Sequence, residues 1–205
     1  MPALSSVVLV GGTPTGGWGV TRFGDDENLA VTVPFAISMY GYSTTTPYVN
    51  CNGGITLGNC PLGPTNNMLP YTTSCPGPIA AGFWYDFEIQ TDSSQSISYG
   101  TIGTSPNRNL VFDFKEVPYD VENPLYHFQI VFYENSPGIV RYYYYEVSST
   151  GATATIGVQN DGGSLYQQYS YNQAGSVPAG TSGASVATLI LTFNTNTNTY
   201  ISTIV

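Results

Sequence analysis

The stretch LYHFQIVFYENSPGIVRYYYYEV, residues 125–147, decides the fold class. Large apolar or aromatic side chains recur at every second position along both of its halves. A repeat of two is that of a β-strand, whose successive side chains point to opposite faces. Between the halves, residues 135–138 (NSPG) have the composition of a tight turn. Residues 125–148 are therefore predicted to form a long antiparallel hairpin with aromatic residues on both faces.

The same repeat of two runs through most other apolar segments, and no segment has apolar residues at helical spacing between caps. Clusters of Gly, Pro, Asn and Asp separate short strands about every ten residues. The sequence predicts an all-β protein, an antiparallel β-sandwich of jelly-roll-like type with little or no helix. No linker or internal repeat interrupts the chain, so residues 1–205 are predicted to form one domain, least regular at residues 58–78.

Charged residues make up only 8% of the chain, and 13 carboxylates against four lysines and arginines give a net charge of −9. Such a surface repels phosphate backbones and anionic lipids, which disfavours nucleic acid and membrane-surface partners. No apolar run of about 18 residues is present to insert into a bilayer. The first residues, MPALSSVVLVGG, do not resemble a signal peptide. We expect an extracellular protein whose signal was removed, or a domain of a longer chain.

Three cysteines are present, and the sequence leaves their pairing open. A disulfide between Cys60 and Cys75 would close an irregular loop and stabilise the fold by roughly 3 kcal/mol. A disulfide between Cys51 and Cys60 would instead close a hairpin across its own turn. Three buried thiols are the remaining alternative. The spacing does not fit a zinc site.

Both ends of the chain are β-prone and free of charge, as in ALSSVVLV and TLILTFNTNTNTYISTIV. A free strand of this kind aggregates unless it is paired. Each end could pair within its own sandwich, or one end could be donated to the sheet of a neighbouring subunit. Residues 194–199 (NTNTNT) could be a flexible step before such an arm or a polar strand. The second alternative predicts a homo-oligomer or filament.

The densest acidic group is Asp25, Asp26 and Glu27, in a loop before a predicted strand. Carboxylate oxygens at a loop are ligands that calcium prefers. The group lacks the alternating spacing of a calcium-binding loop, so a polar turn is the competing interpretation. Apart from calcium, the sequence predicts no cofactor.

Catalytic patterns are weak. Asp86 and Glu88 lie two residues apart and would share a strand face, and paired carboxylates can do acid–base work on glycosides. His127 is the single histidine, and no nucleophile motif accompanies it. A solvated strand face and a mid-strand histidine are the simpler interpretations, so we expect a protein without enzymatic activity.

Tyrosines offer a candidate ligand surface. Tyr142 and Tyr144, or Tyr166, Tyr169 and Tyr171, could stack on the rings of a neutral glycan among asparagines and glutamines. Packing between neighbouring strands is the competing interpretation for each tyrosine.

Four motifs in order resemble the nidogen-like (NIDO-like) family of microbial cell-surface and secreted proteins. They are VTVPFAISMYGYSTTTPYVNCNGGITLG, GTSPNRNLVFDFKEVP, FQIVFYENSPGIVRYYY and ATIGVQNDGGSLYQQYSYNQAGSV, within residues 29–178. The flanks, residues 1–20 and 185–205, lie outside this resemblance. Cys51 and the segment GFWYDFEI depart from the family pattern.

The resemblance implies an extracellular β-sandwich used for adhesion, matrix or surface display, with no catalytic residues to carry over. Together with the charge-free ends, it predicts a structural or adhesion module that self-assembles into fibres by strand donation. A lectin-like module that binds a glycan or host surface through a tyrosine-rich face is the alternative.

Overall fold

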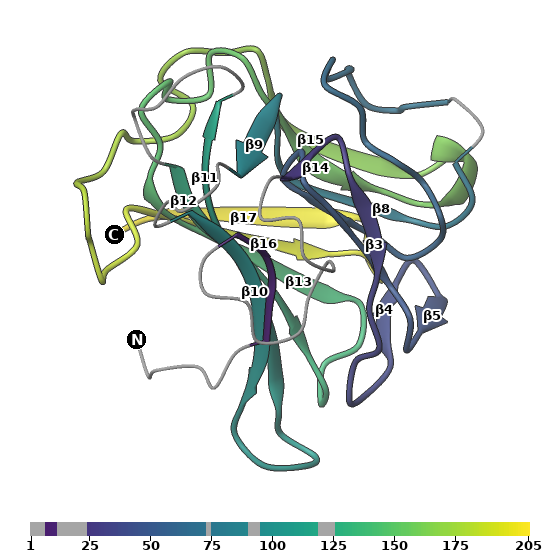
Figure 1. Cartoon of the computed structure of the whole chain (residues 1–205). Helices are drawn as coiled ribbons and strands as arrows, with labels where there is room; N and C mark the ends of the chain where they lie inside the picture. The colour runs from purple at the N-terminus through teal and green to yellow at the C-terminus, as the bar shows by residue number, and fades with distance from the viewer. Residues whose placement is uncertain (1–6, 12–23, 73–74, 90–94, 119–125) are drawn as a thin grey trace.

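The computed structural model describes residues 7–11, 24–72, 75–89, 95–118 and 126–205, and it is an antiparallel β-sandwich (Figure 1). The strands are β1 Val7–Gly11, β2 Gly24–Asp25, β3 Asn28–Ala30, β4 Ile37–Met39, β5 Tyr42–Thr44, β6 Tyr48–Asn50, β7 Gly54–Thr56, β8 Ile79–Trp84, β9 Phe87–Ile89, β10 Ser96–Ile102, β11 Asn109–Pro118, β12 Tyr126–Tyr133, β13 Ile139–Glu146, β14 Thr155–Gln159, β15 Tyr166–Tyr171, β16 Leu189–Asn194 and β17 Thr199–Ile204. One 3₁₀ turn, η1 (Asp161–Gly163), is the only helical element in these ranges. The predicted all-β class is confirmed.

Two sheets form the layers of the sandwich. The larger sheet has nine strands in the order β1-β10-β11-β12-β13-β16-β17, with β9 and β2 attached beside β11. The smaller sheet has the order β15-β14-β8-β7-β6-β3, and β4 and β5 form a separate hairpin. Strands β10 to β13 lie side by side in the order in which they follow along the chain, as in a meander. No helix in the described part of the chain could span a membrane.

The predicted hairpin of residues 125–148 is formed by β12 and β13 and is confirmed. Phe128 lies opposite Tyr144, and Ile130 lies opposite Tyr142. These four side chains are fully buried, since they point to the inner face of the larger sheet. The strict alternation of the sequence thus places one aromatic set in the core and the other on the outer face.

Two buried tyrosines connect the layers. The hydroxyl of Tyr142 donates to the carbonyl of Gly157 in β14 at 2.9 Å, and that of Tyr144 donates to the carbonyl of Gly82 in β8 at 2.6 Å. Gly82 has no space for a side chain, because a Cβ there would lie 2.7 Å from Cδ1 of Ile130. Each tyrosine therefore fills the core with its ring and satisfies its hydroxyl on the opposite sheet.

Residues 58–72 and 75–78 have no regular secondary structure, but they pack on the smaller sheet. A disulfide joins Cys60 to Cys75, with their Cα atoms 4.8 Å apart. The pair shares a small apolar cluster with Trp84 and Leu62. The indole of Trp84 donates to the carbonyl of Gly63 at 2.8 Å. The Cys60–Cys75 pairing is the one present, and Cys51 is fully buried in the main core.

Amide side chains hold this irregular segment in place. The side-chain oxygens of Asn50, Gln168 and Gln159 accept from the backbone N–H groups of the loop at 2.7–2.8 Å. The Gln159 side chain also donates to the carbonyl of Tyr71. Side chains thus replace a β-ladder as partners of the loop backbone. The described residues of 58–78 lack regular secondary structure, as predicted. They are nevertheless attached to the sheet by these hydrogen bonds and by the disulfide.

Both terminal strands pair within the sheet of their own chain. Strand β1 pairs antiparallel with β10, and β17 pairs antiparallel with β16 from Thr199 opposite Asn194 to Ile204 opposite Leu189. In Figure 1, the yellow strands β16 and β17 complete one side of the sheet whose middle is teal and green. Strand β17 is consequently an edge strand.

Candidate functional site

The outermost strand of the larger sheet, β17, exposes all six of its residues. Tyr200 is 42% exposed, Ile201 68% and Ile204 79%, and the following Val205 is 64% exposed. Single exposed apolar residues are ordinary, but here four within six positions place apolar side chains on both faces of one strand, with Tyr200 and Ile204 on one face and Ile201 and Val205 on the other. We call residues 199–205 the C-terminal edge.

The backbone of the C-terminal edge has a free side. Among the described residues, β17 has β16 as its one strand partner. The N–H of Val205 donates to the carbonyl of Thr188, and the N–H of Thr195, just after β16, donates to the carbonyl of Gly138, just before β13. Because bonding direction alternates along an antiparallel strand, odd-numbered residues of β17 bond to β16. The N–H and C=O groups of Tyr200, Ser202 and Ile204 therefore point away from the sheet.

The side chains of the C-terminal edge also carry no charge. No Asp, Glu, Lys, Arg or His occurs from residue 162 to residue 205, although the whole chain carries 13 carboxylates. Edge strands that must stay unpaired usually carry a lysine, a proline or an inward charge. None of these is present in β17. This strand therefore lacks the devices that block edge-to-edge pairing.

Contacts to the smaller sheet hold the start of the C-terminal edge in position. The ring of Tyr200 packs edge-on to Tyr169 of β15 at 6.0 Å and beside Phe193 of β16 at 5.6 Å. The side-chain oxygen of Asn198 accepts from Gln167 at 3.0 Å and from the hydroxyl of Tyr40 at 2.9 Å. These contacts hold the turn before β17, so that residues 194–199, left open as a flexible step or a polar strand, form the turn between β16 and β17 with one strand residue at each end.

Tyr142 and Tyr144 cannot bind a glycan, because both are 0% exposed. This prediction is wrong for a physical reason. Alternation gives two faces without saying which is inner, and in β13 the even positions face the core. The outer face instead carries Tyr143, whose hydroxyl lies 3.1 Å from that of Tyr133, while the Arg141 guanidinium lies over the Tyr133 ring.

The three tyrosines of β15 do not form one platform. A register shift at Ile156 and Gly157 displaces Tyr169, which packs against the core and donates its hydroxyl to the Ser176 carbonyl at 2.7 Å. Tyr166 is 42% exposed and Tyr171 is half-buried. Tyr166 is thus the most exposed of the three, whereas Tyr169 and Tyr171 are each half-buried.

A cleft of about 300 Å³ opens between β10 and the segment before β4. It is lined by Thr32, Val33, Pro34, Tyr99, Gly100, Thr101 and Leu110. The ring of Tyr99 stacks on Phe112 at 5.8 Å, and its hydroxyl donates to the carbonyl of Thr32 at 3.3 Å. The cleft has the size of the smallest ligand sites and mixes an aromatic ring with hydroxyl groups.

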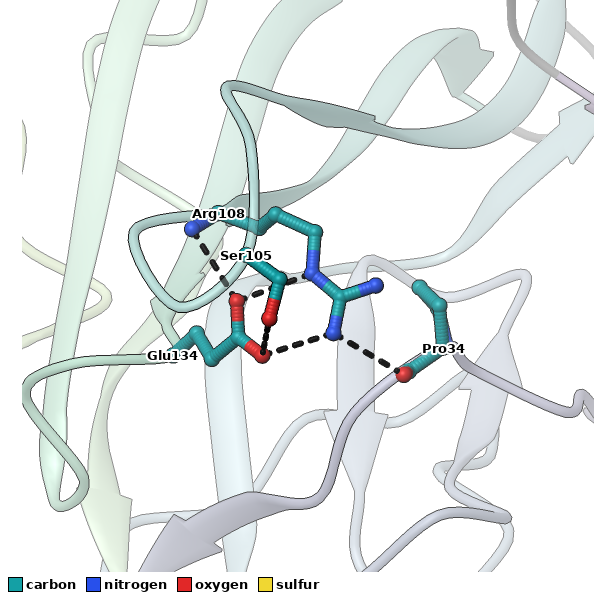
Figure 2. Close-up of polar contacts among 4 residues, drawn as sticks. All are labelled: Pro34, Ser105, Arg108 and Glu134. Atoms are coloured by element: carbon teal, nitrogen blue, oxygen red, sulfur yellow. Dashed lines mark hydrogen bonds and ion pairs between the residues drawn. The ribbon is translucent and has the colours of Figure 1, made fainter.

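Arg108 fixes the segment that forms one wall of this cleft (Figure 2). Its guanidinium donates to both carboxylate oxygens of Glu134, at 2.8 and 2.6 Å, and to the carbonyl of Pro34 at 3.3 Å. The hydroxyl of Ser105 donates to the same carboxylate at 3.2 Å. The hydrogen bonds from Arg108 hold the pKa of Glu134 down, at about 2. A two-pronged pair of this kind fixes geometry as well as charge.

Three carboxylates gather beside the β2–β9 pair. One oxygen each of Asp25, Asp26 and Asp86 lies within 4.8 Å of the others, whereas Glu27 is outside this group. Asn52 donates to Asp26 at 2.7 Å. Burial raises the pKa of Asp25 and of Asp86, and the neighbouring carboxylates raise both further. The calcium prediction therefore rests on Asp86 in place of Glu27.

The weak catalytic candidates lie in two places in the fold, with Asp86 and Glu88 near each other at β9 and His127 on the larger sheet. Asp86 belongs to the acidic group, while Glu88 lies in β9 and is 5% exposed. On the outer face of the larger sheet, Nε2 of His127 lies 2.9 Å from Oδ1 of Asp113, and the imidazole ring stacks on the ring of Tyr145. Burial raises the pKa of Asp113, but its interactions with His127, Gln129 and Lys115 together outweigh burial, so that this pKa is lowered.

The family model described as NIDO related matches residues 8–203. The chain belongs to the NIDO-related family. Neither the curated proteins nor the solved structures gave a match. The match extends well beyond residues 29–178, so it takes in most of both flanks. In this NIDO-related chain, β17 is thus part of the family module and not an appendage to it.

Sequence reasoning missed the residues that form the cleft in this NIDO-related module. Tyr99 and Thr101 lie in β10, whereas Thr32 and Pro34 lie some 65 residues earlier. The motifs around these positions indicated strands, and only the packing of the two sheets brings them together. The pairing of Arg108 with Glu134 had a weak signal, because both residues stand beside predicted turns.

Proposed function

We propose that this chain is a non-enzymatic extracellular structural or adhesion module that assembles through its C-terminal edge. The observation that carries the proposal is the exposure of Tyr200, Ile201, Ile204 and Val205 on an edge strand with one strand partner in the described structure. An extended segment that adds to such an edge gains main-chain hydrogen bonds and covers the apolar patch.

The extracellular setting is supported by two independent features. The chain belongs to the NIDO-related family, whose members are modules of an extracellular type. The Cys60–Cys75 disulfide forms and persists in oxidising compartments and is rare in the cytosol. The low content of charged residues, 8%, fits a surface that displays hydroxyl and amide groups. A place at the cell surface or in a matrix is part of the proposal.

Assembly by edge addition requires no strand to leave its own sheet. Strand donation by a terminus would require β1 or β17 to separate from β10 or β16. Edge addition leaves both pairings intact and uses groups that already point outward. Donation by residues 1–6 stays a prediction, because these residues lie outside the described part of the chain.

The experiment is sedimentation velocity of the full chain over a range of concentrations. We compare the natural chain with the double variant Ile201→Lys/Ile204→Lys. The matched control is Val186→Lys/Leu165→Lys, which adds the same charge at apolar positions that are 65% and 46% exposed outside β17. We expect association of the natural chain and the control, and monomers for the edge variant. Monomers in all three proteins, up to millimolar concentration, would contradict the proposal.

A glycan-binding module is the second candidate function, and the cleft beside Tyr99 favours it. Its aromatic ring and the hydroxyl of Thr101 are the types of group that hold a neutral sugar ring. Tyr166 and Tyr171 remain as additional candidates. Calcium stays a proposal for the group of Asp25, Asp26 and Asp86.

A panel of neutral oligosaccharides tests this second function. We expect Tyr99→Ala to abolish binding of any oligosaccharide that the natural chain binds. Tyr42→Ala is the control, because Tyr42 is 41% exposed and lies outside the cleft lining. Circular dichroism confirms that both variants are folded. An equal loss in both variants, or no binding by the natural chain, would exclude the cleft as a glycan site.

A further inference from the structure

We infer that the partner of the C-terminal edge is a second copy of this chain, paired antiparallel with it about a two-fold axis at Ser202. The inference rests on the proposed function and adds the identity of the partner, the register and the size of the assembly. It is drawn from the direction of the backbone groups, the side chains on each face and the distribution of charge.

The backbone fixes which registers are allowed. Tyr200, Ser202 and Ile204 direct their N–H and C=O groups outward, as derived from the bonding of Val205 and Thr195. Two copies can exchange these groups only if outward-pointing residues face one another. A two-fold axis at Ser202 places Ser202 opposite Ser202 and Tyr200 opposite Ile204 of the second copy. All three outward-pointing residues of β17 are then used in each copy.

The side chains in this register complement one another. Tyr200 and Ile204 lie on the face of the sheet that carries Phe193 and Leu189, so that a cross-strand pair extends the apolar core face. On the other face, Ile201 lies opposite Thr203 of the second copy. Pairs of an aromatic with a β-branched residue are among the favourable cross-strand combinations.

The charge distribution favours a second copy. The chain has a net charge of −9, so two copies repel one another over most of their surfaces. The C-terminal edge belongs to the stretch from residue 162 onward that carries no charge. Like chains can therefore meet there without placing like charges in contact. A partner that binds through its own basic side chains would find no side-chain carboxylate on β17 itself.

The contact closes on itself. A two-fold contact uses the same surface on both subunits and is complete with two copies. The two larger sheets join into one continuous sheet across the axis. A filament would need a further contact at another edge. The interface is short, so we expect a dimer that depends on concentration, like other small interfaces.

Cysteine cross-linking of the full chain tests the register. In the proposed pair, the two Ser202 Cα atoms are about 5.5 Å apart, within the range of a disulfide. We expect Ser202→Cys to give a covalent dimer on mild oxidation. Thr203→Cys is the matched control, because diagonal neighbours in such a pair stand about 7–8 Å apart and do not bridge. The natural chain measures any contribution of its own cysteines.

The outcomes separate this inference from the proposed function. A dimer that cross-links through Ser202→Cys and not through Thr203→Cys supports both. A dimer or filament that cross-links through neither variant, or equally through both, overturns the two-fold register and leaves assembly at the edge standing. Binding of another protein to the edge of a chain that stays monomeric overturns the second copy as partner. A chain that stays monomeric and binds nothing at β17 overturns both.

Discussion

Strands β13 and β17 belong to one sheet and both carry tyrosine and β-branched residues, yet their burial differs. In β13, Tyr142 and Tyr144 are fully buried and bonded to the other layer. In β17, Tyr200 and its neighbours are exposed. Strand β13 has β12 on one side and β16 on the other, whereas β17 has one strand partner among the described residues. In these two strands, the position in the sheet decides whether a tyrosine is buried or exposed.

The comparison assigns different roles to the same chemistry. A tyrosine in the middle of the sheet contributes to folding, since its ring fills the core and its hydroxyl bonds across the sandwich. A tyrosine at the edge adds little to the folded monomer and becomes available to a partner. Substitutions in β13 should therefore change stability, and substitutions in β17 should change association.

The largest effect is expected for Tyr144→Ala. The substitution leaves a cavity in a fully buried site and removes the hydrogen bond to Gly82. We expect a loss of about 3–5 kcal/mol in the free energy of unfolding. Urea denaturation followed by circular dichroism measures it. A loss below about 1 kcal/mol would break the distinction between the two strands.

Tyr142→Phe removes a hydroxyl and keeps the ring, which sharpens the comparison. The Gly157 carbonyl loses a donor in a buried site. We expect a loss of about 1 kcal/mol, typical of one hydrogen bond. Tyr200→Phe is the control at the exposed strand, with an expected change within about 0.5 kcal/mol. Equal losses in both variants would show that the buried hydroxyl has no special role.

Asp86→Asn tests a half-buried site, intermediate between the buried residues of β13 and the exposed residues of β17. Burial and the carboxylates of Asp25 and Asp26 raise the pKa of Asp86 in the folded chain. A raised carboxyl pKa means that the charged form destabilises the fold, and that the cost disappears as the pH falls through the folded pKa. We expect the variant to be more stable than the natural chain at pH 7, by less than about 1 kcal/mol because the site is partly solvated. This advantage should vanish in acid.

Calcium reverses the sign of this prediction if the group binds it. The carboxylates of Asp25, Asp26 and Asp86 are the oxygen ligands that the ion would use. Thermal unfolding with calcium, with magnesium and with chelator measures the effect. A calcium-dependent rise in Tm that Asp86→Asn removes would support the site. An unchanged Tm at millimolar calcium would reject it.

The smallest effect on stability is expected for Ile204→Lys. The side chain is 79% exposed, so a lysine keeps its charge in water and leaves no cavity. We expect the free energy of unfolding to change by no more than about 0.5 kcal/mol. Denaturation at a concentration where the chain is monomeric measures this. A loss of several kcal/mol would mean that the C-terminal edge belongs to the folding core.

Sequence patterns predicted the strands well and the burial of their faces poorly. The repeat of two identified β12, the turn and β13, since each strand alternates regularly. The choice between Tyr142 and Tyr143 as the exposed residue depended on which face meets the second sheet, and alternation carries no such information. Tyr142 was therefore a wrong candidate ligand residue.

Contacts between distant segments lay outside what the sequence could reveal. The acidic group includes Asp86, some 60 residues after Asp25, because β9 pairs with β2. The register shift in β15 separates Tyr169 from Tyr166, and no residue pattern marks it. The charge-free end, by contrast, was visible in the sequence, because composition does not depend on tertiary contacts.

Residue-resolved hydrogen exchange at low and high protein concentration tests the central claim most directly. The amides of Tyr200, Ser202 and Ile204 point to the free side of β17, and those of the odd-numbered residues bond to β16. We predict that protection of the three even-numbered amides rises with concentration, while the odd-numbered amides stay protected throughout. Rapid exchange of these three amides at every concentration would contradict assembly through the C-terminal edge.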